Sequence, residues 1–233
     1  MNKIWLLEGS FATHLRFAPG ADGAEPLTIT FLTWPESMQE FAMGLYTGHN
    51  VERPSPAAEM ILTLEDFDKD FFSWGGSMFV SERMLQAMAL DEAQVRYYEI
   101  DDNRSAALVR SKNYMIMQPL LEDDVSDPEK SIYQMERFMR QAPLTPAYVR
   151  SIALRPDFEP DCELFFDSFF STELFCTDGL ASRILSAGCT GATFTHPTGF
   201  GDGNRLCRTR RGVEKVVGRV KGEEITQLVE AID

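Results

Sequence analysis

The chain has 233 residues, of which 44% are hydrophobic and 25% are charged, as in an ordinary globular protein. Its formal net charge of −14 disfavours non-specific binding to nucleic acid or anionic membranes and is compatible with a basic partner. No stretch approaches the ~20 apolar residues of a membrane span, and the apolar run Ile4–Leu7 is too short for a signal peptide. We therefore expect a reduced, cytoplasmic protein.

Four cysteines lie in the last third of the chain, at Cys162, Cys176, Cys189 and Cys207. None forms a C-x-x-C pair, and the chain has only three histidines, so we expect no structural metal site and no cofactor. Cys176 and Cys189 lie inside apolar segments, which predicts buried free thiols.

The first third of the chain shows alternating strand and helix patterns. Ile4–Leu7 is predicted to be a strand, and so is Leu27–Thr33, in which threonine alternates with apolar residues. Trp34, Met38, Phe41 and Leu45 recur at helical spacing. Met60–Leu64 is a further predicted strand.

Two segments share one local pattern. Phe71-Phe72-Ser73 precedes the strand Met78–Val80, and Phe169-Phe170-Ser171 precedes the strand Leu174–Cys176. Each strand then meets a hydroxyl residue followed by an acid, Ser81-Glu82 or Thr177-Asp178, which is typical of a helix start. The match is compatible with an internal duplication and equally with the common rules of helix capping.

The second copy of this pattern has the clearest helix of the chain. Leu180, Ile184 and Leu185 form one apolar stripe. Gly188 is predicted to end the helix in the left-handed conformation and to bring Cys189 near Ile184. A strand is predicted at 191–195.

Between the two copies, further strands are predicted at Val95–Ile100, Tyr114–Met117 and Tyr148–Leu154. The acidic segment Leu121–Glu129 is predicted to be a loop, Ile132–Arg140 a short helix, and Leu164–Phe170 a largely buried segment. Together these elements predict an α+β fold with mixed or antiparallel sheets and short capped helices. We expect one compact domain over residues 1–233, with two related halves (1–105 and 106–233) as an alternative.

Few residues point to catalysis. The run Asp66-x-Asp68-x-Asp70 opens like a calcium loop, but Phe71 stands at the glycine position and Ser77 at the final ligand position. The G-x-S-x-G and H-E-x-x-H motifs are absent. A glycine-rich run at Thr198–Asn204 is followed by four arginines that are compatible with an anionic ligand, namely Arg205, Arg208, Arg210 and Arg211. No catalytic residue is assigned.

The segment Leu174–Phe194 resembles the C-terminal block of the eleventh immunity-protein family of bacterial polymorphic toxin systems, formerly a domain of unknown function. The matching positions are Thr177, Asp178, Gly188, Thr190 and Gly191. Tyr114–Tyr133 is similar to the family's strand, acidic turn and Lys-Ser step. The resemblance extends loosely over residues 60–196.

This resemblance implies a non-enzymatic inhibitor that binds a cognate toxin. The acidic balance of the chain, in turn, predicts neither nucleic acid nor membrane as partner. A toxin with a basic surface would be attracted by acidic residues. The first candidate contacts are Glu122, Asp123, Asp124 and Asp127, and the second are Asp66, Asp68 and Asp70; in both cases a solvated acidic loop is the alternative. An enzyme that uses residues 199–211 on an anionic ligand and an adaptor for a secreted effector stay open as other functions.

Overall fold

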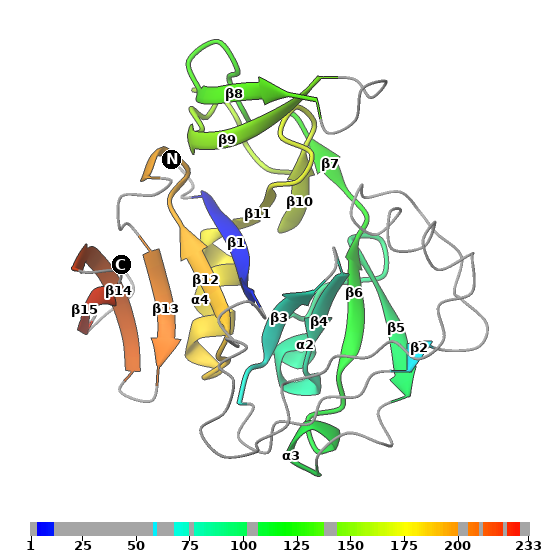
Figure 1. Cartoon of the computed structure of the whole chain (residues 1–233). Coiled ribbons are helices and arrows are strands. Elements are labelled where there is room, and N and C mark those ends of the chain that lie inside the picture. The colour runs from blue at the N-terminus through cyan, green and yellow to red at the C-terminus, as the bar shows by residue number, and fades with distance from the viewer. Residues whose placement is uncertain are drawn as a thin grey trace. The chain divides into compact units, whose positions relative to one another are not determined.

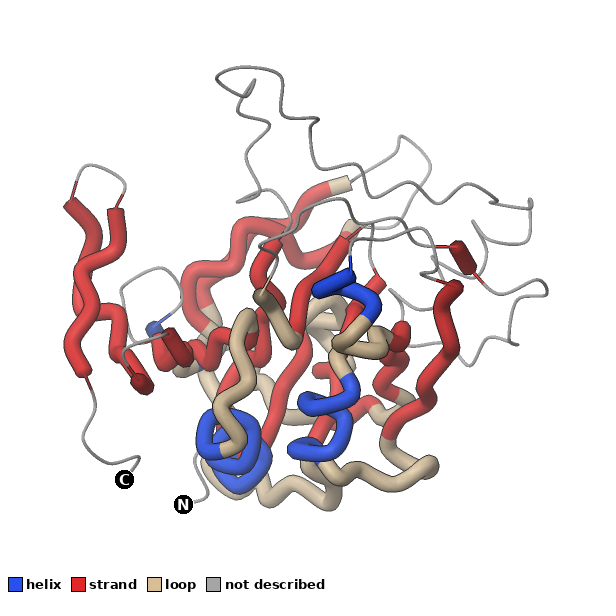
Figure 2. The backbone as a smooth tube through the Cα atoms, turned by 90° about the horizontal axis from the view of Figure 1, so that it is seen from below, coloured by secondary structure: helices blue, strands red, loops and turns tan. Residues whose placement is uncertain are grey.

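The computed structural model describes residues 4–11, 58–59, 68–74, 77–101, 107–137, 144–199, 205–209, 212–220 and 223–228. Strands make up most of the regular structure, together with a few short helices (Figures 1 and 2). The sheets are mixed and antiparallel, so the predicted α+β class is confirmed. No helix in the described ranges is long and apolar enough to cross a membrane.

The chain divides into two units by its internal contacts. The first unit comprises residues 1–8, 121–182 and 193–233, and the second comprises 9–120 and 183–192. Each unit is therefore assembled from separate stretches of the chain. The expectation of one compact domain stays a prediction.

The second unit is built around an antiparallel sheet with the strand order β3-β4-β6-β5. Its elements are β2 (Ala58–Glu59), β3 (Phe71–Trp74), β4 (Ser77–Val80), α2 (Glu82–Met88), β5 (Val95–Asp101), α3 (Ala107–Arg110) and β6 (Met115–Pro119). β2 adds to β5 in parallel, and the end of β1 (Ile4–Phe11) adds to β3 in parallel. Phe72 and Phe79 stack across β3 and β4 with ring centroids 4.7 Å apart.

In the first unit, β1 lies between β11 and β12. The remaining elements are β7 (Glu122–Asp123), β8 (Ile132–Glu136), β9 (Thr145–Ser151), β10 (Leu164–Asp167), β11 (Leu174–Thr177), α4 (Asp178–Ser186), β12 (Ala192–Thr195), η2 (Pro197–Gly199), β13 (Arg205–Thr209), β14 (Gly212–Val220) and β15 (Glu223–Leu228). Of these, residues 183–186 of α4 and Ala192 of β12 are counted with the second unit. β12 to β15 follow one another as antiparallel neighbours. On the other side, β11 pairs with β10, and β10 pairs in parallel with β7.

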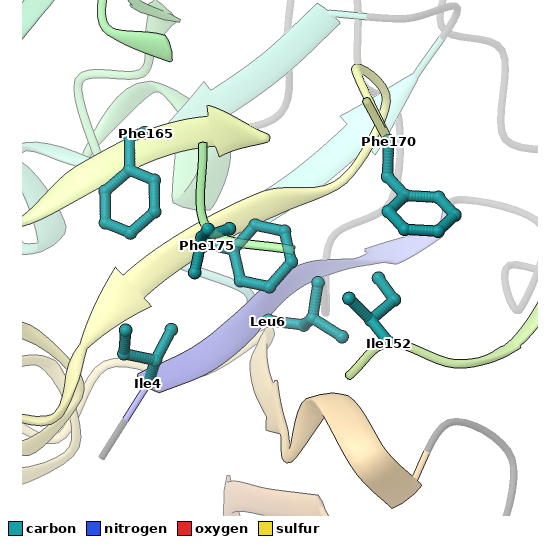
Figure 3. Packing of buried hydrophobic residues seen from close by; sticks show 7 residues of the cluster. Ile4, Leu6, Ile152, Phe165, Phe170 and Phe175 are labelled. Carbon is teal, nitrogen blue, oxygen red and sulfur yellow. The ribbon is translucent and has the colours of Figure 1, made fainter. Parts of the chain in front are cut away.

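One cluster of seven buried apolar residues lies in the core of the first unit, and Figure 3 shows six of them labelled. They come from β1, β10, β11 and the connecting segments: Ile4, Leu6, Val125, Ile152, Phe165, Phe170 and Phe175. Phe165 and Phe175 stack across neighbouring strands with centroids 6.0 Å apart. Aromatic pairs of this kind add to the free energy gained by burying apolar surface.

Both predicted helix starts are confirmed. The Ser81 hydroxyl accepts a hydrogen bond from the backbone N–H of Met84 at 3.2 Å, and the Thr177 hydroxyl accepts one from Leu180 at 3.3 Å. The predicted end of the second helix is confirmed too, because Gly188 has φ +76° and the Cys189 N–H donates to the Ile184 carbonyl.

The two capped helices occur in the same arrangement of strands. The hairpin β3–β4 leads into α2 and β5, with β6 paired to β4; the hairpin β10–β11 leads into α4 and β12, with β1 paired to β11. Each cap residue also forms an equivalent backbone hydrogen bond: the Ser81 N–H donates to the Asp70 carbonyl, and the Thr177 N–H donates to the Glu163 carbonyl. If these two hydrogen bonds are taken as equivalent, Phe71–Ser73 corresponds to Leu164–Phe166. The sequence pattern instead matches Phe71–Ser73 with Phe169–Ser171, which lies further along the chain. The common topology supports a duplication, which stays a prediction.

Two predicted elements differ from the structure. Within the predicted acidic loop Leu121–Glu129, Glu122 and Asp123 form the short strand β7, because β10 supplies a parallel partner. The other difference is a predicted helix that is wrong. Residues Ile132–Glu136 form strand β8, paired with β9, where the sequence predicted a helix over Ile132–Arg140. Tyr133 packs against Phe169 and Phe170 with centroid distances of 5.4 and 5.2 Å, and β9 supplies the hydrogen-bonding partner. Both contacts are distant in sequence, so a local helical pattern could not reveal them. The elements predicted within residues 27–45 and 60–64 lie outside the described residues.

Candidate partner-binding site

A cleft of about 710 Å³ opens on the first unit and is strongly acidic. Its lining consists of Asp123, Asp124, Asp127, Pro128, Glu129, Arg155, Pro156, Asp157, Phe158, Glu159 and Asp161. Seven of these side chains are carboxylates, and Arg155 is the only cation among them. The lining comes from two chain segments, 123–129 and 155–161, which lie on either side of the β8–β9 hairpin in the sequence.

A buried carboxylate holds the first of these segments in place. Asp167 is fully buried at the end of β10 and accepts hydrogen bonds from the Ser126 N–H at 2.9 Å and the Ser126 hydroxyl at 2.8 Å. The same carboxylate accepts the backbone N–H groups of Phe169 and Phe170. A buried charge with four donors is fully satisfied, so Asp167 fixes the backbone beneath the cleft.

Arg155 joins the two walls of the cleft. Its guanidinium donates to the Ser126 carbonyl at 2.9 Å and forms an ion pair with Asp124 at 2.5 Å. Its backbone N–H donates to the Val125 carbonyl. The Arg155 and Asp124 side chains are about half exposed, so the ion pair organises the wall more than it stabilises the fold.

The cleft has a net negative potential. Asp127 pairs with Lys130 at 2.5 Å, and the hydrogen bond from Lys130 lowers the pKa of Asp127. Asp157 and Glu159 form no ion pair within the described part of the chain. Burial, followed by the charges of Asp123 and Asp161, raises the pKa of the neighbouring Cys162 thiol to about 11. Carboxylates thus outnumber cations, and the site is suited to a cationic ligand.

Three of the four residues in the first predicted acidic set, Asp123, Asp124 and Asp127, line this cleft. Glu122 lies beside them on β7 with an exposed side chain. Asp157, Glu159 and Asp161 were not among the predicted residues, although these acids alternate with other residues between Pro156 and Cys162. These residues line the cleft because the fold brings them close to the segment 123–129, and a local sequence pattern cannot reveal that proximity.

The second predicted acidic set lies in the second unit and has a different environment. Asp70 is 1% exposed, accepts the Ser81 hydroxyl at 2.8 Å and forms ion pairs with Arg83 and Lys112. Asp68 is exposed and bonded to Lys112 at 2.8 Å, and Asp66 lies outside the described residues. The two described acids of this set, Asp68 and Asp70, are thus already paired with cationic side chains of the chain itself. Asp70 is therefore not presented at a surface.

Asp70 also forms hydrogen bonds with Thr190, the residue before Gly191. It accepts the Thr190 N–H at 2.8 Å, and the Thr190 carbonyl accepts the N–H groups of Asp70 and Phe71. Gly191 follows with φ +89° and packs directly on the Phe71 backbone. Thr190 and Gly191 are thus structural residues, because they fasten this turn to the start of β3.

The arginine set of the alternative function is not placed in a site. Arg205 and Arg208 lie on β13, where the structure describes the backbone, and Arg210 and Arg211 lie outside the described residues. Cys176 and Cys189 are buried free thiols, as predicted. Among the described residues, no group of three or more His, Cys, Asp or Glu could hold a metal ion.

A family model described as the Imm11 immunity protein family matches residues 58–197, more than half of the chain. The chain belongs to the Imm11 family. A comparison with curated proteins gave no match. The region that matches Imm11 contains the acidic cleft, the capped helix α4, and Asp70 with its partners Ser81, Arg83, Lys112 and Thr190, here called the Asp70 cluster. Family membership indicates an immunity role.

Proposed function

We propose that this Imm11 protein is a cytoplasmic immunity protein that neutralises a cognate bacterial toxin by binding it directly. The acidic cleft at 123–161 is the proposed contact, and a basic surface of the toxin is the proposed ligand. Membership of an immunity family supports the role. The observation that supports the contact is a cleft with seven carboxylates and one arginine.

The physical argument concerns the rate and the specificity of binding. A concave surface of one charge sign focuses the electric field and accelerates encounter with a partner of opposite sign. A basic toxin surface would meet carboxylates such as Asp157 and Glu159, which have no cation of their own within the described residues. The net charge of −14 extends the attraction beyond the cleft.

The first experiment is a native pull-down of the tagged protein from its host, with the partner identified by mass spectrometry. A stoichiometric partner whose C-terminal domain kills cells when expressed alone, and whose killing this chain suppresses, is the expected result. Absence of such a partner while the neighbouring genes are expressed would contradict the immunity proposal. A partner whose export changes without any rescue of growth would indicate an adaptor.

Charge reversal then tests the cleft. We expect Glu159→Lys to weaken toxin binding by about tenfold and to reduce rescue, because it places a cation against a basic partner. Glu92→Lys is the matched control, since Glu92 is an exposed acid of the second unit outside the cleft. Equal affinities of the two variants would show that the cleft does not bind the toxin.

A further inference from the structure

The β8–β9 hairpin has an open edge. Within the described residues, β8 and β9 form a two-stranded sheet, and no third strand lies along β8. Figure 1 shows the pair at the top, with β8 as the upper strand. β9 is continued by Ile152, whose N–H donates to the Pro197 carbonyl of η2. The edge open to a partner is therefore that of β8.

The register shows which backbone groups face this edge. Met135 stands opposite Pro146, and proline has no N–H to offer a neighbouring strand. In an antiparallel pair, hydrogen-bonded and non-hydrogen-bonded positions alternate. The Met135–Pro146 position is consequently a non-hydrogen-bonded one, and the N–H and carbonyl of Met135 point away from β9, towards the open edge.

The side chains of β8 leave this edge unprotected. Natural edge strands are commonly blocked by charged side chains, above all lysine, by proline, by a β-bulge or by a covering segment. The sequence of β8, I-Y-Q-M-E, contains neither lysine nor proline, and its one charge is Glu136 at the end of the strand. The register shift between β8 and β9 lies between Ile132 and Gln134, so the pairs from Gln134 to Glu136 are regular. Ile132 is 60% exposed and Met135 is 42% exposed, and Leu144, which precedes Thr145 at the opposite end of the hairpin from Ile132, is 52% exposed. A strand with exposed apolar side chains and an open backbone edge is a template for pairing with another chain.

Hydrogen bonds connect the hairpin to the acidic cleft. The Ser131 hydroxyl, immediately before β8, donates to the Asp127 carbonyl at 2.7 Å and accepts the Ala153 N–H at 3.0 Å. Pro128 and Glu129 of the same turn line the cleft. The β8 edge therefore begins where the cleft wall ends, and both belong to the first unit.

We propose that an extended segment of the toxin adds to β8 as a third strand, with Lys or Arg side chains at one end entering the acidic cleft. This inference rests on the proposed function and specifies how the toxin binds. Main-chain pairing along β8 would supply affinity, and the neighbouring carboxylates would select a basic segment. A second copy of this chain is the less suitable occupant, because pairing would bring two acidic clefts together.

The test compares two variants at one position. Met135→Ala removes the side chain and keeps the outward N–H, whereas Met135→Pro removes both and leaves the N–H groups that bond β9 in place. With the toxin domain captured by the wild-type protein as the probe, we expect Met135→Pro to lose at least about tenfold more affinity than Met135→Ala. Thermal unfolding of each variant establishes that the hairpin is folded.

Hydrogen exchange of the wild-type complex provides a measurement that needs no variant. We expect the amides of residues 132–136 to exchange at least about tenfold more slowly with toxin bound. Unchanged exchange, equal affinities of the two variants, or a homodimer through β8 would overturn the strand addition. If the wild-type chain neither binds nor neutralises a toxin, the proposed function fails as well; if it neutralises one and β8 is unaffected, only this inference fails.

Discussion

At the scale of single residues, two glycines of the family block make different demands on the chain. Gly191 has φ +89°, and a Cβ there would collide with the Phe71 carbonyl, whereas Gly188 has φ +76° with no neighbouring atom within 4 Å of such a Cβ. We expect Gly191→Ala to lower the free energy of unfolding by roughly 3 kcal/mol or more, and Gly188→Ala by about 1 kcal/mol. Urea denaturation measures both. Similar losses of unfolding free energy in the two variants would show that a Cβ close to the Phe71 carbonyl adds no destabilisation.

Glu173 gives the fold a dependence on pH. Burial, and then the negative charges of Glu8 and Asp167, raise its pKa from 4.5 to about 7, against a hydrogen bond with Thr172 that lowers it. The folded state therefore holds the proton more tightly than the unfolded chain, and stability is expected to fall as pH rises from about 4.5 to 7. Glu173→Gln should remove this decline, so that the variant exceeds the wild type by up to about 3 kcal/mol at pH 8 but not at pH 4. Denaturation curves at the two pH values provide the comparison.

At the scale of elements, the Asp70 cluster fastens the turn at Thr190 to the start of β3. Burial opposes ionisation of Asp70, but hydrogen bonds from Arg83, Thr190 and Ser81, with the charge of Lys112, lower its pKa overall. Its contribution is thus present above about pH 4 and is lost as pH falls further. We expect Asp70→Asn to cost about 3 kcal/mol of unfolding free energy at pH 7 and less at pH 3.

Asp68→Asn is the control for this substitution. The Asp68 side chain is 51% exposed and pairs with Lys112, so its replacement should cost under about 1 kcal/mol. Equal effects of the two substitutions would contradict the assignment of Asp70 as the residue that organises this turn.

The same elements show what sequence could predict. Ser81, Thr177 and Gly188 act within one helical turn, so their positions predicted both helix starts and the second helix's end. Strand β8 was mistaken for a helix because its structure depends on β9 and on Phe169 and Phe170, which no local pattern includes. The sequence predicted no cleft, only an acidic run at 122–127 as a candidate contact; residues 123–127 turn out to line one wall, and residues 157–161 join them through the fold.

At the scale of the whole molecule, charge and shape together specify the expected partner. The chain carries 36 acidic against 22 basic side chains, and the cleft concentrates this excess at one concave place. The β8 edge adds an apolar, hydrogen-bonding surface beside it. Long-range charge would govern the encounter, and short-range contacts at the strand would govern the lifetime of the complex. The two contributions can be separated by salt.

Raising NaCl from 50 to 300 mM is expected to slow toxin association by about tenfold, because the screening length shortens from roughly 14 to 6 Å. The dissociation rate should change much less, since closely packed contacts at β8 are poorly screened. Surface plasmon resonance measures both rates. Glu159→Lys should flatten the dependence of the association rate on salt, whereas Glu92→Lys should retain most of it. An association rate independent of salt in the wild type would mean that the acidic cleft does not steer the toxin, even if the two proteins bind.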